Sequence, residues 1–170
     1  ANALWWRRVS MKRIPDKQNM LIKRFIAKEC AGIPDSLGAR RMEVLHERIA
    51  RDFEYESDRD WYMDLDQGLP RMGDQVNEER IRDISRYDLY SKLLNALRLN
   101  HVTAYVLDKR AGRLDDRFIG PMTDNEWLFG VRDGDDMLWM HPKRMRNGWF
   151  ANELPFYWEG TSALLIDLRR

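Results

Sequence analysis

The chain of 170 residues is 44% hydrophobic and 34% charged, and its formal net charge at pH 7 is +1. This length is typical of one domain that removes about 70% of the extended chain's surface from water. The apolar content and the low net charge exclude a disordered chain. Charged or amide residues interrupt every apolar run before the roughly 20 residues that span a bilayer, so we expect no transmembrane segment. A single cysteine, Cys30, excludes an internal disulfide framework.

Residues 1–14 predict an extended docking arm. They show no sustained helical or strand period, and the adjacent Trp5 and Trp6 are followed at once by Arg7 and Arg8. Two neighbouring indoles are costly to leave in water, which indicates that they pack on a partner or on the protein's own core. The arm is basic and contains no acidic residue. Such a composition is typical of a mitochondrial N-terminus.

Charge is unevenly distributed along the chain. Residues 1–49 carry eleven Lys/Arg against five Asp/Glu, whereas residues 51–88 carry six against twelve. This asymmetry is compatible with a basic surface for nucleic acid or anionic lipid beside an acidic surface for a basic partner. The simpler interpretation is that the two oppositely charged parts attract each other or lie as solvated faces.

Two amphipathic helices joined by a short turn are predicted after the arm. The first starts at Asp16 and stops at Gly32. Asp35 or Ser36 is the expected N-cap of the second, whose apolar stripe continues to about Tyr55.

The stretch from residue 56 to 74 is acidic and contains the run D-R-D-W-Y-M-D-L-D. Alternating carboxylates of this kind are ligands that Ca²⁺ prefers, but the run lacks the glycine and the spaced glutamate of an EF-hand. We therefore expect a solvated connection. A third and longest helical region is predicted over residues 76–100, bent or broken around residues 85–88.

The remainder of the chain predicts a small antiparallel sheet. Residues 102–107 are β-branched and alternating, and residues 162–168 form the last predicted strand. Between them, E-W-L-F-G-V and D-M-L-W-M-H flank R-D-G-D, which predicts a β-hairpin. Helices followed by strands indicate the α+β class. We expect about three helices within residues 15–100 and a β region over residues 101–170, packed together as one domain.

The sequence shows no catalytic or metal-binding pattern. His46, His101 and His141 are isolated from one another and from Cys30, whereas zinc needs three or four nitrogen or sulfur ligands. Phosphate loops, nucleophile elbows and dinucleotide fingerprints are lacking as well. We therefore expect no catalytic residue, no cofactor and no metal ion. A nucleophilic Cys30 with a histidine base stays open as an alternative, although a small buried residue near a helix end is ordinary.

One stretch of the chain carries a family resemblance. Its matching residues are Gly68, Leu69, Arg71, Asp74, Glu78, Ile81, Leu89, Tyr90, Ala96, Leu97, Leu99 and Asn100. In this order they resemble the central part of subunit 7 of mitochondrial respiratory complex III, the ubiquinol–cytochrome c reductase binding protein. In that family a similar G-L-x-R and acidic stretch leads into arginine-rich helices and an A-L-x-L-N segment. The family is mostly helical, so a C-terminal sheet would be a lineage-specific extension.

The resemblance implies a non-catalytic accessory subunit of the respiratory chain. Such a subunit lies peripherally on the matrix side of the mitochondrial inner membrane, packs on cytochrome b and the core subunits, and holds no cofactor. The resemblance and the arm together predict these partner-binding residues: Trp5, Trp6, Arg7, Arg8, Arg71 and Tyr90. Other protein subunits are the expected partners, with peripheral contact to anionic lipid. The alternatives are a mitochondrial ribosomal protein that binds RNA, an ATP synthase accessory protein, and a small soluble enzyme that uses His46, His101 or Cys30.

Overall fold

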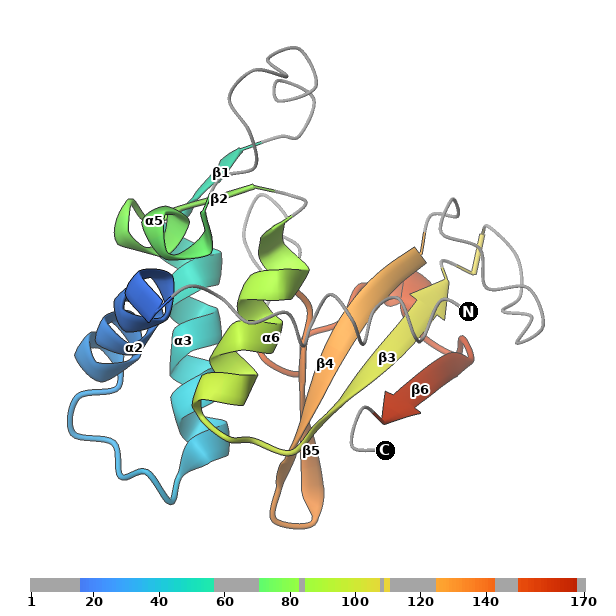
Figure 1. The fold of residues 1–170 in the computed structure, drawn as a ribbon. Coiled ribbons are helices and arrows are strands. Elements are labelled where there is room, and N and C mark those ends of the chain that lie inside the picture. The colour runs from blue at the N-terminus through green and yellow to red at the C-terminus, as the bar shows by residue number, and fades with distance from the viewer. Residues whose placement is uncertain are drawn as a thin grey trace.

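The computed structural model describes residues 16–56, 71–82, 85–107, 109–110, 125–142 and 150–167. In chain order its elements are α2 (Asp16–Glu29), α3 (Gly38–Asp52), β1 (Glu54–Glu56), α5 (Met72–Asn77), β2 (Arg80–Arg82), α6 (Arg86–Ala96), β3 (His101–Leu107), β4 (Asn125–Asp133), β5 (Asp136–Met140), the 3-10 helix η3 (Phe156–Trp158) and β6 (Ala163–Asp167). The helices gather to one side of a sheet formed by the C-terminal part (Figure 1). This arrangement confirms the predicted α+β class.

The first two predicted helices are present with small changes at their ends. α2 starts at the expected Asp16 and ends just before the predicted stop at Gly32. α3 begins later than predicted, because Leu37 takes the N-cap position without a side-chain cap. Asp35 instead accepts a hydrogen bond from the guanidinium of Arg41. The buried apolar side chains of the two helices include Ile22, Phe25, Ile26, Met42, Leu45 and Ile49.

The helical region predicted over residues 76–100 is only partly confirmed: α6 starts at the expected break near residues 85–88, but Arg80–Arg82 form a strand instead of a helix. α5 ends at Asn77, the backbone turns through Glu79 at a φ of +56°, and the short strand β2 precedes α6. β2 pairs in parallel with β1, so that Tyr55 lies opposite Ile81. The side-chain oxygen of Gln75 accepts a hydrogen bond from the backbone N–H of Arg82 at 3.0 Å, which stabilises the extended conformation there.

The main sheet is antiparallel with the strand order β5-β4-β3-β6. β4 and β5 form the predicted hairpin, in which Asp133 pairs with Asp136 across a two-residue turn. Gly134, the first turn residue, has a φ of +61°, a conformation that glycine adopts without steric cost. β6 pairs with β3 at the far edge of the sheet and confirms the last predicted strand.

The hydrophobic core joins the helices to one face of the sheet. Alternate β4 residues Phe129 and Val131, together with Leu138 and Met140 of β5, belong to the same buried cluster as the apolar faces of α2, α3 and α6. A smaller cluster on the opposite face centres on Trp158 of η3. Each fully buried Leu or Phe contributes roughly 1.5–3 kcal/mol relative to exposure. Throughout the described ranges, no helix has the length and apolar character that a membrane crossing requires.

Candidate functional site

The partner-binding residues nominated from the sequence are placed very differently from one another. Trp5, Trp6, Arg7 and Arg8 lie outside the described residues. Arg71 is exposed and takes the N-cap position of α5, where its side chain is open to a partner.

Tyr90, in contrast, is 1% exposed. Its hydroxyl group lies 2.6 Å from Nδ1 of His46, and its ring stacks on Phe129. Burial raises the pKa of this phenol, so the hydroxyl stays protonated. Its nomination as a partner contact is therefore corrected, because the side chain packs inside the domain.

The residues of the enzyme alternative lie on three different elements. Cys30 follows α2 and is buried, and its thiol donates a hydrogen bond to the carbonyl of Arg41 at 3.6 Å. Burial raises the pKa of this thiol, which disfavours the reactive thiolate. His46 is fully buried in α3, and His101 begins β3. The rings of Tyr90 and Phe129 lie between His46 and His101. His46 contacts Tyr90, Tyr90 stacks on Phe129, and Phe129 contacts His101.

A buried polar cluster joins α6 to the sheet. Glu126 of β4 accepts a hydrogen bond from the hydroxyl of Tyr87, and its Oε2 lies 3.5 Å from both Nη2 of Arg86 and Nε2 of His141. The Arg86 guanidinium also lies 4.8 Å from the centre of the Tyr87 ring. Burial raises the pKa of Tyr87, so its hydroxyl remains a donor to the carboxylate.

This cluster surrounds a largely buried carboxylate, 15% exposed, with one hydroxyl and two nitrogen-bearing side chains. Removing one partner of such a group is costly, because the remaining charge stays desolvated. Sequence reasoning missed the cluster because charged residues were interpreted as solvated. The signal that could have found it is the position of Glu126 and His141 at the ends of the apolar hairpin strands. Among the described residues, no group of three or more His, Cys, Asp or Glu is arranged to hold a metal ion.

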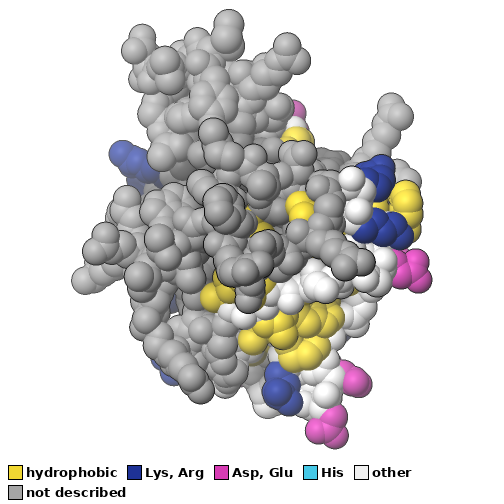
Figure 2. All heavy atoms as spheres, turned by 90° about the vertical axis from the view of Figure 1, so that its right-hand side faces the viewer, with side chains coloured by type: hydrophobic (Ala, Val, Ile, Leu, Met, Phe, Trp, Pro, Cys, Tyr) yellow, Lys and Arg dark blue, Asp and Glu magenta, His cyan; other side chains and the backbone are white. Residues whose placement is uncertain are grey.

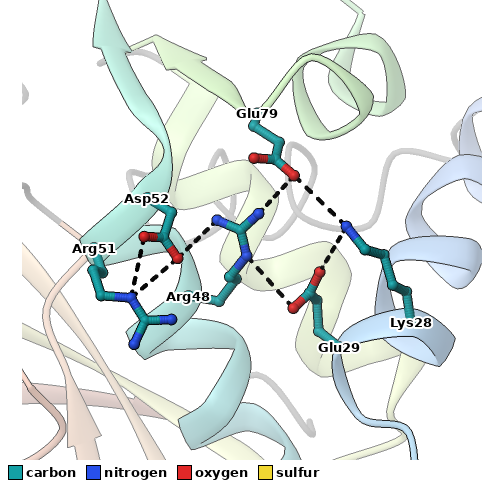
Figure 3. A network of polar contacts seen from close by, with 6 residues as sticks. All are labelled: Lys28, Glu29, Arg48, Arg51, Asp52 and Glu79. Atoms are coloured by element: carbon teal, nitrogen blue, oxygen red, sulfur yellow. Dashed lines mark hydrogen bonds and ion pairs between the residues drawn. The ribbon is translucent and has the colours of Figure 1, made fainter.

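A second polar network connects α2, α3 and the turn before β2 (Figure 3). The guanidinium of Arg48 lies 2.6 Å from Glu79, 2.9 Å from Asp52 and 3.5 Å from Glu29. Lys28 adds contacts of 3.2 Å to Glu29 and 3.8 Å to Glu79. Two basic residues of the N-terminal third thus pair with acidic residues of the following segment. For these residues, the charge asymmetry of the sequence reflects internal attraction.

The surface of the C-terminal segment is unusually apolar. Within residues 150–167, the exposed large hydrophobic side chains are Phe150, Leu154, Phe156 and Leu165, and Phe156 and Leu165 are 70% and 59% exposed. On the side of the molecule where β6 lies, hydrophobic side chains gather at the surface between charged ones (Figure 2). We call the exposed side chains of Phe150, Leu154, Phe156 and Leu165, which are grouped here by sequence, the C-terminal apolar surface. β6 is also an edge strand: in the part of the chain that the structure describes, it pairs only with β3.

None of the protein-family models, curated proteins or solved structures compared with this chain matches it.

Proposed function

We propose that this chain is a non-catalytic accessory subunit of a large mitochondrial assembly, on the matrix side of respiratory complex III. The observation that carries the proposal is the C-terminal apolar surface. Exposed large hydrophobic side chains are common at protein interfaces, where buried aromatic and aliphatic residues supply most of the binding energy. The function is thus to contribute buried area and to fix the positions of neighbouring subunits.

The choice of assembly rests on the sequence. The basic, acid-free residues 1–14 favour mitochondrial import. The resemblance to subunit 7 of complex III favours the respiratory chain. Its described part corresponds to α5, β2, α6 and β3, within which Arg71 is exposed. Peripheral attachment would place the subunit on the membrane proteins without crossing the bilayer itself.

We propose that β6 is the docking element and that a strand of a neighbouring subunit pairs with its open edge. β6 has the sequence A-L-L-I-D and exposes Leu165. An apolar edge strand offers backbone donors and acceptors to an incoming strand, while its side chains supply apolar contact. An exposed apolar edge promotes aggregation of a free monomer, whereas in an assembled subunit a partner strand covers it.

The first experiment is gentle detergent extraction of mitochondrial membranes, followed by native gel separation and mass spectrometry of the band that contains this chain. Co-migration with the absorbance of b- and c-type haem is expected. Migration as a small free species, or in a haem-free complex, would overturn the assignment to complex III.

A matched pair of variants tests the docking element. Leu165→Lys places a charge on β6, and Met20→Lys places the same charge on α2 at a residue of similar exposure, 63% against 59%. We expect Leu165→Lys to release the subunit from the assembly and Met20→Lys to leave it bound. Both proteins should keep wild-type circular dichroism, because neither position is in the core. If Leu165→Lys assembles as well as Met20→Lys, β6 is not the docking element.

A specific observation also favours the ribosomal alternative. α2 exposes Lys17, Lys23 and Arg24 on its solvent side. A row of cations on a helix is an electrostatic surface suited to RNA phosphates. This alternative predicts co-migration with ribosomal RNA and binding that weakens steeply as salt rises. The ATP synthase alternative predicts a haem-free membrane complex in the same gel.

A further inference from the structure

A cavity of about 400 Å³ lies where the connection from α6 to β3 meets the turn end of the β4–β5 hairpin. Its polar side chains belong to Arg98, Asn100, His101 and Arg132, and its apolar wall includes Val102 and Met137. Among the described residues that line it, none is acidic. The volume is within the range of sites that hold small organic ligands.

Arg98 occupies a backbone position that normally belongs to glycine. Its φ is +56°. Its N–H bonds to the carbonyl of Asn95 at 3.1 Å, and the N–H of Leu99 bonds to the carbonyl of Leu94 at 3.0 Å. These two bonds define a Schellman motif at the end of α6, in which the residue with positive φ is usually glycine. A side chain with a Cβ is strained there.

Arginine at this position therefore makes the protein less stable than glycine would. Strain of this kind, once observed, is a reason to look for a function of the side chain. Arg98 lines the cavity together with Arg132, and no ion pair joins either of them to another described residue. Two arginines thus line one space, and no described residue forms an ion pair with either of them.

The hydrogen bond of His101, which also lines the cavity, shows which of its ring nitrogens carries the proton. Its Nδ1 lies 3.1 Å from the carbonyl oxygen of Leu99. A carbonyl can only accept, so Nδ1 carries the proton and donates it. The other ring nitrogen, Nε2, is then an acceptor in neutral imidazole and a donor in imidazolium.

We propose that this cavity binds a phosphate ester, with Arg98 and Arg132 holding the phosphate oxygens. The planar fork of a guanidinium matches two phosphate oxygens at once, which a single ammonium group does not. The apolar wall of Val102 and Met137 contacts the organic part of the ester. A soluble phosphate ester and a phospholipid headgroup share this chemistry.

Calorimetric titration of the full chain with glycerol 3-phosphate, and sedimentation with phosphatidylglycerol or phosphatidylcholine vesicles, separate the two sources. The double variant Arg98→Gln with Arg132→Gln should weaken binding by about tenfold for each arginine. The matched control, Arg40→Gln with Arg51→Gln, removes two exposed charges from α3 and should bind like wild type. Arginine-dependent binding of glycerol 3-phosphate assigns a soluble ester. Arginine-dependent binding of phosphatidylglycerol vesicles alone assigns a lipid headgroup.

Equal losses in the two double variants would show unspecific attraction by charge and would overturn the proposal. Failure of the wild-type chain to bind either probe would overturn it as well. Arg98→Gly provides a second readout: it should weaken binding by about tenfold while raising the midpoint of thermal unfolding by about 2–4 °C, because the strain is relieved. A lower midpoint would contradict the argument from strain.

Discussion

The helical region and the sheet region use their side chains in opposite ways. In the helical region, polar groups connect elements to one another: Gln18 of α2 accepts a hydrogen bond from the N–H of Gly73, and Arg48 joins three carboxylates. In the sheet region, Phe156 and Leu165 are exposed, and Arg98 and Arg132 face a cavity at its edge. Under our proposals, the helices hold the protein together, and the sheet is the part that contacts other molecules.

The largest expected effect compares two leucines, one in each region. Leu45 of α3 is fully buried, and Leu165 of β6 is 59% exposed. Leu45→Ala should lower the free energy of unfolding by about 2–5 kcal/mol, because it leaves a cavity in the shared core. Leu165→Ala should change it by no more than about 0.5 kcal/mol. Guanidinium denaturation measures both. Equal losses would mean that β6 is as important to the fold as the helices are.

Alanine substitutions at two glycines should show a smaller difference in their cost to stability. A Cβ at Gly73 would lie 2.8 Å from the backbone oxygen of Gln18, so the backbone of α2 or α5 must move. A Cβ at Gly130 would meet the ends of the Met137 and Trp139 side chains, both at 2.7 Å, and the Met137 side chain can rotate away. Gly73→Ala should therefore cost about 1–3 kcal/mol, and Gly130→Ala should cost less.

Thermal unfolding of the two alanine variants, compared with wild type, checks this order. The reverse order would show that the outer face of the sheet is packed more rigidly than the contact between α2 and α5.

The smallest effect concerns the Arg48 network and depends on pH. The hydrogen bond from Arg48 holds the pKa of Glu79 below its ordinary value of 4.5. A carboxyl with a lowered folded-state pKa stabilises the fold above its unfolded-state pKa, and this stabilisation is lost as pH falls through the lowered value. Arg48→Met should cost about 1 kcal/mol at pH 7, since most of these partners are partly exposed.

The difference between wild type and Arg48→Met should shrink as the pH falls below about 4.5, and it should also shrink in high salt. Urea denaturation at pH 7 and at pH 3 measures it. Arg51→Met is the control, because Arg51 is 70% exposed and its ion pair is with Asp52. If the two variants behave alike at both pH values, the network adds nothing beyond ordinary surface charge.

Elements with strong local signals could be predicted from the sequence. α2 and α3 repeat apolar residues at helical spacing, the hairpin has Asp-Gly at its turn, and β3 and β6 are β-branched or apolar runs. Each signal lies within a few residues of the element that it specifies. For that reason the α+β class followed directly from the order of the elements.

The parallel pair of β1 and β2 could not be predicted in the same way. Each strand has three residues, and β2 contains one apolar residue, Ile81, which also fits a helical stripe. What makes these residues extended is their pairing with a segment distant in the sequence and the bond from Arg82 to Gln75. Contacts of this kind produce no periodic pattern of apolar residues in the sequence.

The candidate sites were harder to predict than the fold. Tyr90 looks like a surface aromatic residue in an amphipathic helix, but α6 is buried on several sides, and even its Ser91 and Lys92 have low exposure. Glu126 and His141 come together only because the hairpin places them beside the start of α6. The cavity lined by Arg98 and Arg132 likewise lies between a helix end and a hairpin. These two arginines are 34 residues apart in the sequence, so their spacing does not indicate that they lie close together.

The position of β6 also sets an order of events during synthesis. Ala163 of β6 pairs with Val106 of β3, so this pairing cannot form until residue 163 has been made. α2 and α3 are adjacent in sequence and can pack much earlier, because local contacts form faster than distant ones. A nascent chain therefore carries a formed helical part and an unfinished sheet for much of its synthesis. A chaperone that binds the nascent chain should therefore act on β3 and release it only once β6 has been made.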